Sequence, residues 1–295
     1  MEYTDPSTQS ISHTLALHLT QIEQRQNGTF QCTSTGLQEL DQILDGGLQN
    51  GGLYLVAGRP ATGKTALALN VGLNILQSQR PVIIFAPQME HLEVARRLVS
   101  VEGSIHLRSH EPYSPGFEYD ENRSDFHWET FSAAANRVST LPFVINNDAR
   151  ISPSKLRAAS NQVQQAHGDM GLVILDSFEA MATATNARGN KLQDLMSEMK
   201  KIAVDLNVPI IVSSLLHRSI ESRSDRRPML TDLTPGIETP ADVVILLYRD
   251  EMYHLDSPDQ GTLELLIAKN RWGQRGLLRK NFSDEHATIA SPSLG

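Results

Sequence analysis

The residues whose types and spacing are best suited to chemistry lie in one short run, Gly58-Arg59-Pro60-Ala61-Thr62-Gly63-Lys64-Thr65. The run fits the pattern G-x-x-x-x-G-K-[ST] of a phosphate-binding loop. An apolar segment, residues 53–57, enters it, and residues 66–70 leave it with helical character. This is the strand–loop–helix context that the motif requires, although a tight turn between a strand and a helix would have the same outline.

Each part of this loop has a role in binding phosphate. Glycines let backbone N–H groups turn inward and form a cradle for phosphate oxygens at a helix N-terminus, so the predicted nucleotide-binding residues run from Gly58 through Ala66. Lys64 would reach the β- and γ-phosphates, and the Thr65 hydroxyl would take a place on Mg²⁺. The sequence therefore predicts a protein that binds a nucleotide together with Mg²⁺.

An acid stands at the tip of another predicted strand, where residues 171–175 form an apolar run and Asp176 follows. In phosphate-loop proteins a carboxylate at such a tip holds Mg²⁺, directly or through water, against the phosphates. A helix N-cap or a solvated strand end is the alternative. The phosphate-binding loop upstream favours the metal role for Asp176.

Hydrolysis also needs a group that orients or deprotonates the attacking water. Candidates follow the apolar strand predicted over residues 81–86, in Pro87-Gln88-Met89-Glu90. Gln88 can orient a water but cannot take its proton. Glu90 could do both if the loop returns it to the site, and it could equally be a first-turn acid that favours the positive end of a helix.

Two cations, Lys269 and Arg271, follow the strand predicted over residues 262–268. They point the same way if the strand continues, because strand side chains alternate between faces. Such a pair could clamp a γ-phosphate, including one bound to an adjacent subunit. A solvated basic edge that discourages aggregation is the alternative.

Further basic and aromatic residues could contact nucleic acid. Four arginines share the segment 218–227 and could bind a phosphate backbone, but interleaved acids make a self-neutralised surface loop a fair alternative. Trp272 could stack on a base, although burial is more common for tryptophan. The histidines show no metal-ligand spacing.

These residues need a scaffold, and the sequence indicates one of alternating strands and helices. Strands are predicted over 53–57, 81–86, 143–145, 171–175, 208–214, 243–248 and 262–268, and helices over 65–79, 92–101, 126–138, 191–206 and from 153. This alternation indicates an α/β fold with a mostly parallel sheet covered by helices on both faces. Residues 1–10 are expected to be disordered, and residues 102–125 to form a surface excursion.

A short helix is predicted ahead of this scaffold. Ile11, Leu15, Leu19 and Ile22 lie on one helical face and need to be buried, either on their own domain or on a neighbouring subunit. We therefore divide the chain into residues 1–30, a disordered start with a docking helix, and residues 31–295, the α/β domain.

Bulk composition agrees with a core-forming chain. Hydrophobic residues make up 40% of the 295 residues, the net charge is -8, and Cys32 is the single cysteine, so no intrachain disulfide can form. A single cysteine, the lack of a signal peptide and the lack of a membrane span predict a cytoplasmic protein with no membrane partner. A net negative charge is not typical of a protein that binds nucleic acid, but a ring-shaped assembly can carry its basic groups on a small inner face.

Taken in order, the motifs resemble the C-terminal motor domain of DnaB-type replicative DNA helicases, which are RecA-like ATPases. The resemblance covers about residues 30–285, and the run at 248–254 is specific enough to argue against a RecA-type circadian or repair ATPase. The stretches that carry it are Ser34-Thr35-Gly36-Leu37, Gly58 through Thr65, Val173-Ile174-Leu175-Asp176, Leu206-Asn207-Val208-Pro209, His217-Arg218-Ser219, Arg227-Pro228, Tyr248-Arg249-Asp250-Glu251-Met252-Tyr253-His254 and Lys269-Asn270-Arg271-Trp272-Gly273.

The resemblance implies ATP and Mg²⁺ at Lys64, Thr65 and Asp176, with Lys269 and Arg271 reaching the next subunit's site. It also implies a hexameric ring closed by the helix at 11–25, single-stranded DNA in the channel, and replication proteins as partners. The family's N-terminal collar domain is expected to be absent.

Three departures from the family pattern concern the coupling of hydrolysis to DNA. The family's catalytic glutamate falls on Gln88, and its sensor glutamine falls on Leu215, with His217 in place of asparagine. The DNA-contacting loop is shortened to residues 233–238 and lacks its arginine. Losing a general base typically costs a factor of about 10²–10⁴ in rate. Two hypotheses follow: an ATP-hydrolysing helicase motor that works as a ring on single-stranded DNA, or a hydrolysis-impaired paralogue that binds ATP and regulates or co-assembles with a replication partner.

Overall fold

The computed structural model describes residues 10–27, 32–107 and 128–290, and the chain divides into two compact units, Met1–Cys32 and Thr33–Gly295. Of the two segments expected to lack regular structure, residues 1–9 and 108–125 lie outside the described residues. Residues 102 and 103, where the surface excursion was expected to begin, are helical instead.

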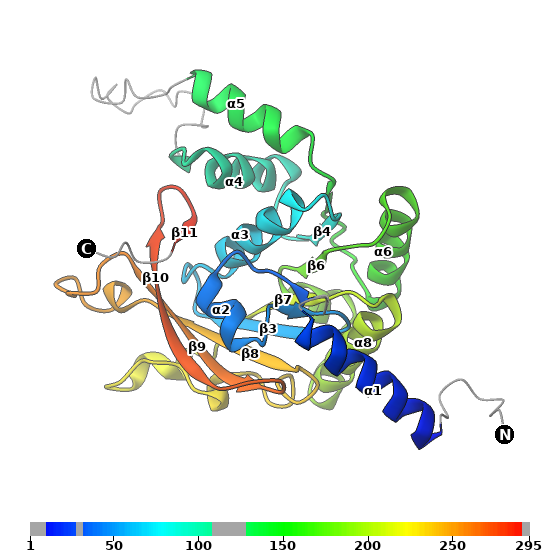
Figure 1. Ribbon diagram of the computed structural model, residues 1–295. Coiled ribbons are helices and arrows are strands. Elements are labelled where there is room, and N and C mark those ends of the chain that lie inside the picture. The colour runs from blue at the N-terminus through cyan, green and yellow to red at the C-terminus, as the bar shows by residue number, and fades with distance from the viewer. Residues whose placement is uncertain (1–9, 28–31, 108–127, 291–295) are drawn as a thin grey trace. The chain divides into compact units, whose positions relative to one another are not determined.

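The first unit contains the predicted helix as α1 (Ile11–Gln26) (Figure 1). The Ser10 hydroxyl accepts a hydrogen bond from the backbone N–H of His13 at 3.2 Å, which satisfies one of the free donors at the start of the helix. The predicted apolar stripe is exposed along its length: Ile11, Leu15 and Leu19 are 73%, 53% and 59% exposed.

The second unit is built on a nine-stranded sheet in the order β11-β10-β9-β8-β3-β7-β6-β4-β5. Six neighbouring strands are parallel, which confirms the predicted mostly parallel α/β sheet: β3 (Leu53–Gly58), β4 (Val82–Phe85), β5 (Phe143–Asn146), β6 (Leu172–Leu175), β7 (Ile210–Leu215) and β8 (Val243–Tyr248). The remaining three are antiparallel, namely β9 (Thr262–Asn270), β10 (Gly276–Ser283) and β11 (Thr288–Ala290). Two short strands, β1 (Cys32–Thr33) and β2 (Leu48–Gln49), lie outside this sheet.

Helices cover both faces of the sheet, as the continuous apolar strands require. One face carries α2 (Gln38–Ile43), α3 (Lys64–Gln77) and α4 (His91–Gly103), and α5 (Trp128–Ser139) packs on α4. The other carries α6 (Pro153–His167), α7 (Phe178–Ala184) and α8 (Asn190–Leu206). Short 3₁₀ turns at Arg218–Ser222, Leu230–Asp232 and Asp250–Met252 complete the described elements. None of the described helices combines the length and apolar character needed to cross a bilayer.

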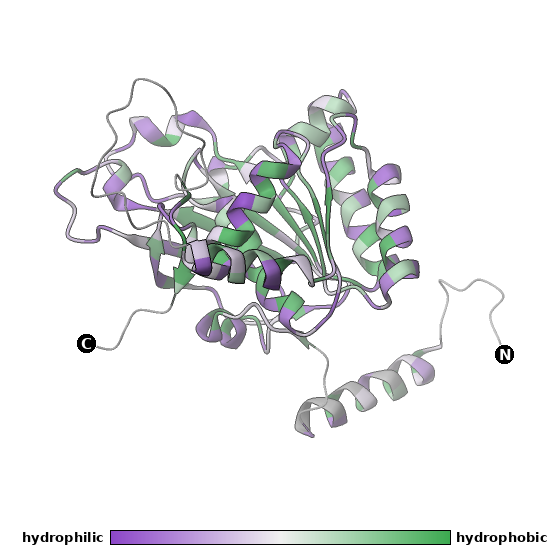
Figure 2. Ribbon diagram, turned by 90° about the horizontal axis from the view of Figure 1, so that it is seen from above, coloured by the Kyte–Doolittle hydropathy of each residue, from purple (hydrophilic) through white to green (hydrophobic). Residues whose placement is uncertain are grey.

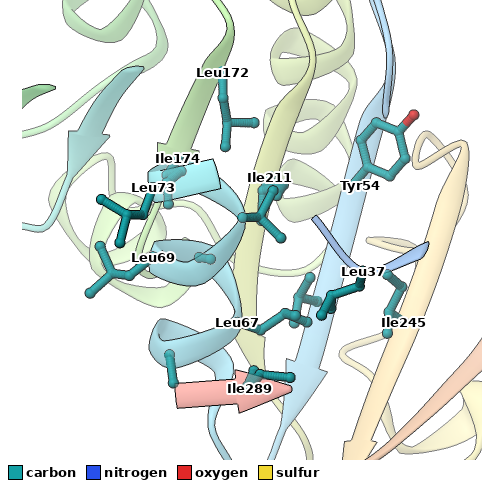
Figure 3. Packing of buried hydrophobic residues seen from close by; sticks show 14 of the residues in the cluster. Leu37, Tyr54, Leu67, Leu69, Leu73, Leu172, Ile174, Ile211, Ile245 and Ile289 are labelled. Atoms are coloured by element: carbon teal, nitrogen blue, oxygen red, sulfur yellow. The ribbon is translucent and has the colours of Figure 1, made fainter. Parts of the chain in front are cut away.

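Alternation along β3 divides the core into two clusters. Tyr54 and Val56 face α3, whereas Leu53, Leu55 and Ala57 face α8. Figure 2 shows the apolar strands enclosed between helices of mixed character, and Figure 3 shows leucines of α3 packed on the isoleucines of β6 and β7.

Parallel strands bring their carboxyl ends to one edge of the sheet. Gly58 of β3 is the register partner of Leu215 of β7, and Phe85 of β4 is the partner of Leu175 of β6. We call this the phosphate-loop edge and define it as residues 58–65, 86–90, 176–179 and 215–217. The end of β9 lies at the other end of these strands, beside the start of β8, since Asn270 pairs with Val243. We call it the opposite edge, residues 242 and 269–271.

Candidate nucleotide-binding site

The predicted phosphate-binding loop turns tightly between β3 and α3. Two of its residues, Ala61 and Gly63, adopt positive φ angles of 62° and 102°. A Cβ at Gly58 would meet the Thr62 hydroxyl oxygen at 2.2 Å, so the turn has no space for a side chain there. Helix α3 begins at Lys64 and has no acid in its first turn, so its positive end is free to attract an anion.

The Lys64 side chain lies inside this loop. Its ammonium donates hydrogen bonds to the carbonyl oxygens of Gly58 and Arg59 at 3.0 and 2.8 Å. Burial lowers the pKa of Lys64 to about 8, against the opposing effect of the Asp176 and Glu179 carboxylates. Lys64 is therefore a cation that burial has made easy to deprotonate and that an added anion would stabilise.

The predicted pair Thr65 and Asp176 meets at the phosphate-loop edge, although 111 positions separate the two residues. The Thr65 hydroxyl donates to Asp176 Oδ2 at 2.5 Å, and the Ser213 hydroxyl donates to Oδ1 of the same carboxylate. Asp176 is buried at the end of β6. The fold thus fixes a hydroxyl oxygen and a carboxylate side by side at the start of α3.

These two oxygen donors fit Mg²⁺, which is commonly held by one or two protein oxygens together with substrate phosphates. The described residues contain no group of three or more His, Cys, Asp or Glu side chains that could hold a metal ion by themselves. A cation here would therefore depend on the bound nucleotide for further ligands.

Gln88 and Glu90 also lie at the phosphate-loop edge, because the end of β4 is next to the end of β6. The N–H of Asp176 donates to the carbonyl of Phe85 at 2.8 Å. Both side chains are exposed, and Glu90 occupies the N-cap of α4 without a side-chain capping bond. The structure does not join Glu90 to Lys64 or Asp176, so its placement agrees with the alternative of an acid at the positive end of a helix.

The side chain of Arg59, a residue of the loop, is held by contacts outside the loop. Its guanidinium forms an ion pair with Glu221 at 2.6 Å and donates to the carbonyl of Leu216 at 2.9 Å. The phosphate-binding loop is thereby linked to the segment that follows β7.

Glu179 is a further site residue, and it is one that sequence reasoning missed. It lies in the first turn of α7, and its Oε1 accepts hydrogen bonds from the Ser214 hydroxyl at 2.6 Å and the Leu215 N–H at 2.7 Å. The only sequence signal is an acid three positions after Asp176. That signal becomes informative once β7 is known to lie between β3 and β6.

Lys269 and Arg271 lie at the opposite edge. The Lys269 ammonium donates to the carbonyls of Glu238 and Thr239 at 3.0 and 2.9 Å, and burial lowers its pKa against the opposing charge of Asp242. Strand β9 ends at Asn270, and Arg271 forms an ion pair with Asp242 at 3.1 Å. Since the six residues of β3 separate the two edges, the pair is about 20 Å from Lys64 of the same chain.

Most of the arginines in 218–227 have partners within the chain, but these partners lie outside the segment and are not the interleaved acids that the self-neutralised alternative invoked. Arg223 pairs with Asp232 at 2.9 Å, Arg227 pairs with Glu264 at 2.9 Å, and the Arg226 guanidinium lies 5.1 Å from the centre of the Tyr253 ring. Trp272 is partly buried against the core, with its ring centre 5.8 Å from that of Tyr54. These contacts leave Arg218 as an exposed cation of the segment.

Comparison of the sequence with known proteins gives a consistent result. The sequence model described as DnaB-like helicase C terminal domain matches residues 32–291. The replicative DNA helicase DnaC of Bacillus subtilis (strain 168) is 31% identical over 94% of this chain and 61% of its own length. The replicative DNA helicase DnaB of Geobacillus stearothermophilus is 31% identical over 88% of this chain and 56% of its own length. The chain thus spans about 60% of the length of these curated relatives.

Solved structures agree with the sequence comparison. A DnaB-like replicative helicase, solved in a study of its interactions with primase, superposes with a TM-score of 0.83 at 29% identity over 98% of this chain and 68% of its own. A structure described as an ATPase domain gives a TM-score of 0.85 at 28% identity, over 96% of this chain and 99% of that one. The RadB recombinase, at 19% identity and a TM-score of 0.55, shares the fold alone.

Proposed function

The chain belongs to the DnaB-like helicase C-terminal domain family, and from that premise we propose that it is an ATP-hydrolysing motor that assembles as a ring on single-stranded DNA. The observation that carries this proposal is the meeting of Lys64, Thr65 and Asp176 at one edge of the sheet. A cation, a hydroxyl and a carboxylate at the start of a helix are the groups that a Mg²⁺-triphosphate requires.

Binding of ATP would use the backbone N–H groups of residues 58–66 for the phosphates and Lys64 for their charge. Thr65 and Asp176 would hold Mg²⁺, which when bound neutralises charge on the phosphates. Before that, the Lys64 ammonium must leave the carbonyls of Gly58 and Arg59 and turn towards the phosphates.

A ring is supported by the separation of the two edges. Lys269 and Arg271 are too far from Lys64 of their own chain to touch the same nucleotide, whereas a head-to-tail neighbour can present its opposite edge to this phosphate-loop edge. Arg271 is suited to this role because its side chain is 67% exposed, and its ion pair with the buried Asp242 holds it in place. An arginine supplied in this way stabilises charge that develops on the γ-phosphate.

The second candidate function, an ATP-binding paralogue with impaired hydrolysis, is favoured by one observation. Gln88 is an amide that cannot accept a proton, and it stands at the position where the family resemblance implies a glutamate. Such a protein would bind ATP, assemble, and act on a replication partner without turning over nucleotide.

Steady-state ATP turnover with Mg²⁺, with and without single-stranded DNA, separates the two functions. The motor requires turnover that rises with DNA and is lost in Lys64→Ala, in which the cation that meets the phosphates is removed. Tight ATP binding by the wild type without turnover, with or without DNA, would favour the paralogue and contradict the motor.

A further inference from the structure

One carboxylate at the phosphate-loop edge has an oxygen that forms no hydrogen bond within the described structure. Oε1 of Glu179 accepts two hydrogen bonds, whereas Oε2 is buried and has no partner. Buried carboxylate oxygens are normally hydrogen-bonded, and one without a partner is costly to fold. Oε2 therefore represents proton-accepting capacity that no described group uses.

The position of Glu179 relative to the phosphate-binding loop follows from two contacts. Its Oε1 is 2.7 Å from the backbone nitrogen of Leu215, and Leu215 is the register partner of Gly58, the first residue of the loop. The Gly58 carbonyl in turn accepts a hydrogen bond from the Lys64 ammonium at 3.0 Å. The negative charge of Glu179 is close enough to Lys64 to raise the pKa of that ammonium.

The other described carboxylates at this edge or in contact with it are either already paired or exposed to solvent. Both oxygens of Asp176 already accept hydrogen bonds, from Thr65 and Ser213. Glu221 is ion-paired with Arg59. Glu90 is exposed at the start of α4.

Glu179 also lines a pocket of about 290 Å³, together with polar residues such as Arg188 and apolar residues such as Ala182 and Leu192. A water molecule occupies about 30 Å³ of liquid, so this partly open pocket of mixed polar and apolar lining has room for several. Glu179 therefore borders both the end of β7 and a pocket that is open to solvent.

We infer that Glu179 is the general base of this site, an inference that rests on the proposed ATP hydrolysis. A water held by the Glu179 carboxylate gives it one proton, while the water's own oxygen forms a bond to the γ-phosphorus. The bond between the γ-phosphorus and the β–γ bridging oxygen breaks, and its electron pair stays with the ADP that leaves. Glu179 then releases the proton to solvent, and the products are ADP and inorganic phosphate.

The test compares wild type with Glu179→Gln in ATP turnover, ATP affinity and thermal unfolding. Glutamine keeps an oxygen that can accept from Leu215 and Ser214 but cannot take a proton, so turnover should fall at least about 100-fold. ATP affinity should stay within about twofold. Glu198→Gln, which removes the same charge from an exposed position on α8, should match wild type.

The outcomes distinguish this inference from the proposed function. If Glu179→Gln turns over ATP within about twofold of the wild-type rate, Glu179 only holds the end of β7 in place through its hydrogen bonds. That result would overturn the inference, while the motor proposal would stand. Turnover lost in Glu90→Gln but kept in Glu179→Gln would also overturn it. A wild-type protein that binds ATP without hydrolysing it would overturn both the motor proposal and the inference about Glu179. That result needs no variant, so failure of the proposed function can be told apart from failure of the inference.

Discussion

At the scale of single residues, the Lys64 ammonium is the group most sensitive to solution conditions. Burial lowers the pKa of Lys64 to about 8 in the free protein. Because phosphate binding needs the charged form, and the charged fraction falls about tenfold between pH 7 and 9, affinity for ATP should fall by about the same factor. Fluorescence anisotropy of a labelled ATP analogue at fixed Mg²⁺ measures this affinity at each pH. Lys64→Met, which binds weakly, should lose this slope, and a wild-type affinity equal at the two pH values would contradict the role of Lys64.

The same pKa shift affects the stability of the free protein. The folded pKa of Lys64 is below the unfolded value of 10.5, so the unfolded state binds more protons in the window from about 8 to 10.5. The contribution of Lys64 to the free energy of unfolding therefore increases as pH rises through that window. The difference between the urea unfolding midpoints of wild type and Lys64→Met should therefore be smallest near pH 10.5, the alkaline end of this window.

Residues of the site differ in how far the sequence could predict them. The loop from Gly58 to Thr65 could be predicted because eight consecutive residues carry the whole pattern. Asp176 could be predicted from its place at a strand tip. Glu179 could not, because its contacts depend on β7 lying beside β3, and that strand order is not encoded in any local spacing.

At the scale of elements, β3 connects the core to the site, because its carboxyl end becomes the phosphate-binding loop. Leu55 is fully buried near the middle of this strand, between β7 and β8. Leu55→Ala should lower the free energy of unfolding by about 2–5 kcal/mol, through lost burial and the cavity left behind. Urea unfolding with an unchanged m-value measures this loss.

The matched control is Leu255→Ala, at a leucine that is 89% exposed. It should change the free energy of unfolding by no more than about 0.5 kcal/mol. Equal losses in the two variants would mean that β3 is not the central strand of the core.

The helices and strands, like the site residues, could be predicted where neighbouring residues carry a clear pattern and could not be predicted elsewhere. Buried parallel strands such as β4 and β6 are continuous apolar runs and were predicted nearly to their ends. Strands β10 and β11 were missed, because β10 mixes polar and apolar residues along an antiparallel edge and has no such run. Helix α7 was missed because its seven residues are too few for a periodic pattern.

At the scale of the whole molecule, the exposed stripe of α1 predicts assembly. Apolar side chains of this size on one helical face need a protein surface to cover them. Leu15→Asp should therefore reduce the oligomer formed with ATP and Mg²⁺ to smaller species, as measured by light scattering after size exclusion. His13→Asp, an exposed position on the other side of the same helix, is the control. Full assembly of Leu15→Asp would show that the stripe is not an interface.

The central claim is that each nucleotide site is shared, with the phosphate-loop edge of one copy facing the opposite edge of the next. Mixing two inactive variants, Lys64→Ala and Arg271→Ala, tests it most directly. In a mixed ring an Arg271→Ala subunit keeps its own Lys64 and can receive Arg271 from a Lys64→Ala neighbour, so we expect ATP turnover to reappear on mixing and to peak near equal proportions. Turnover that stays at the level of the separate variants at every ratio, in rings shown to contain both, would contradict the shared site.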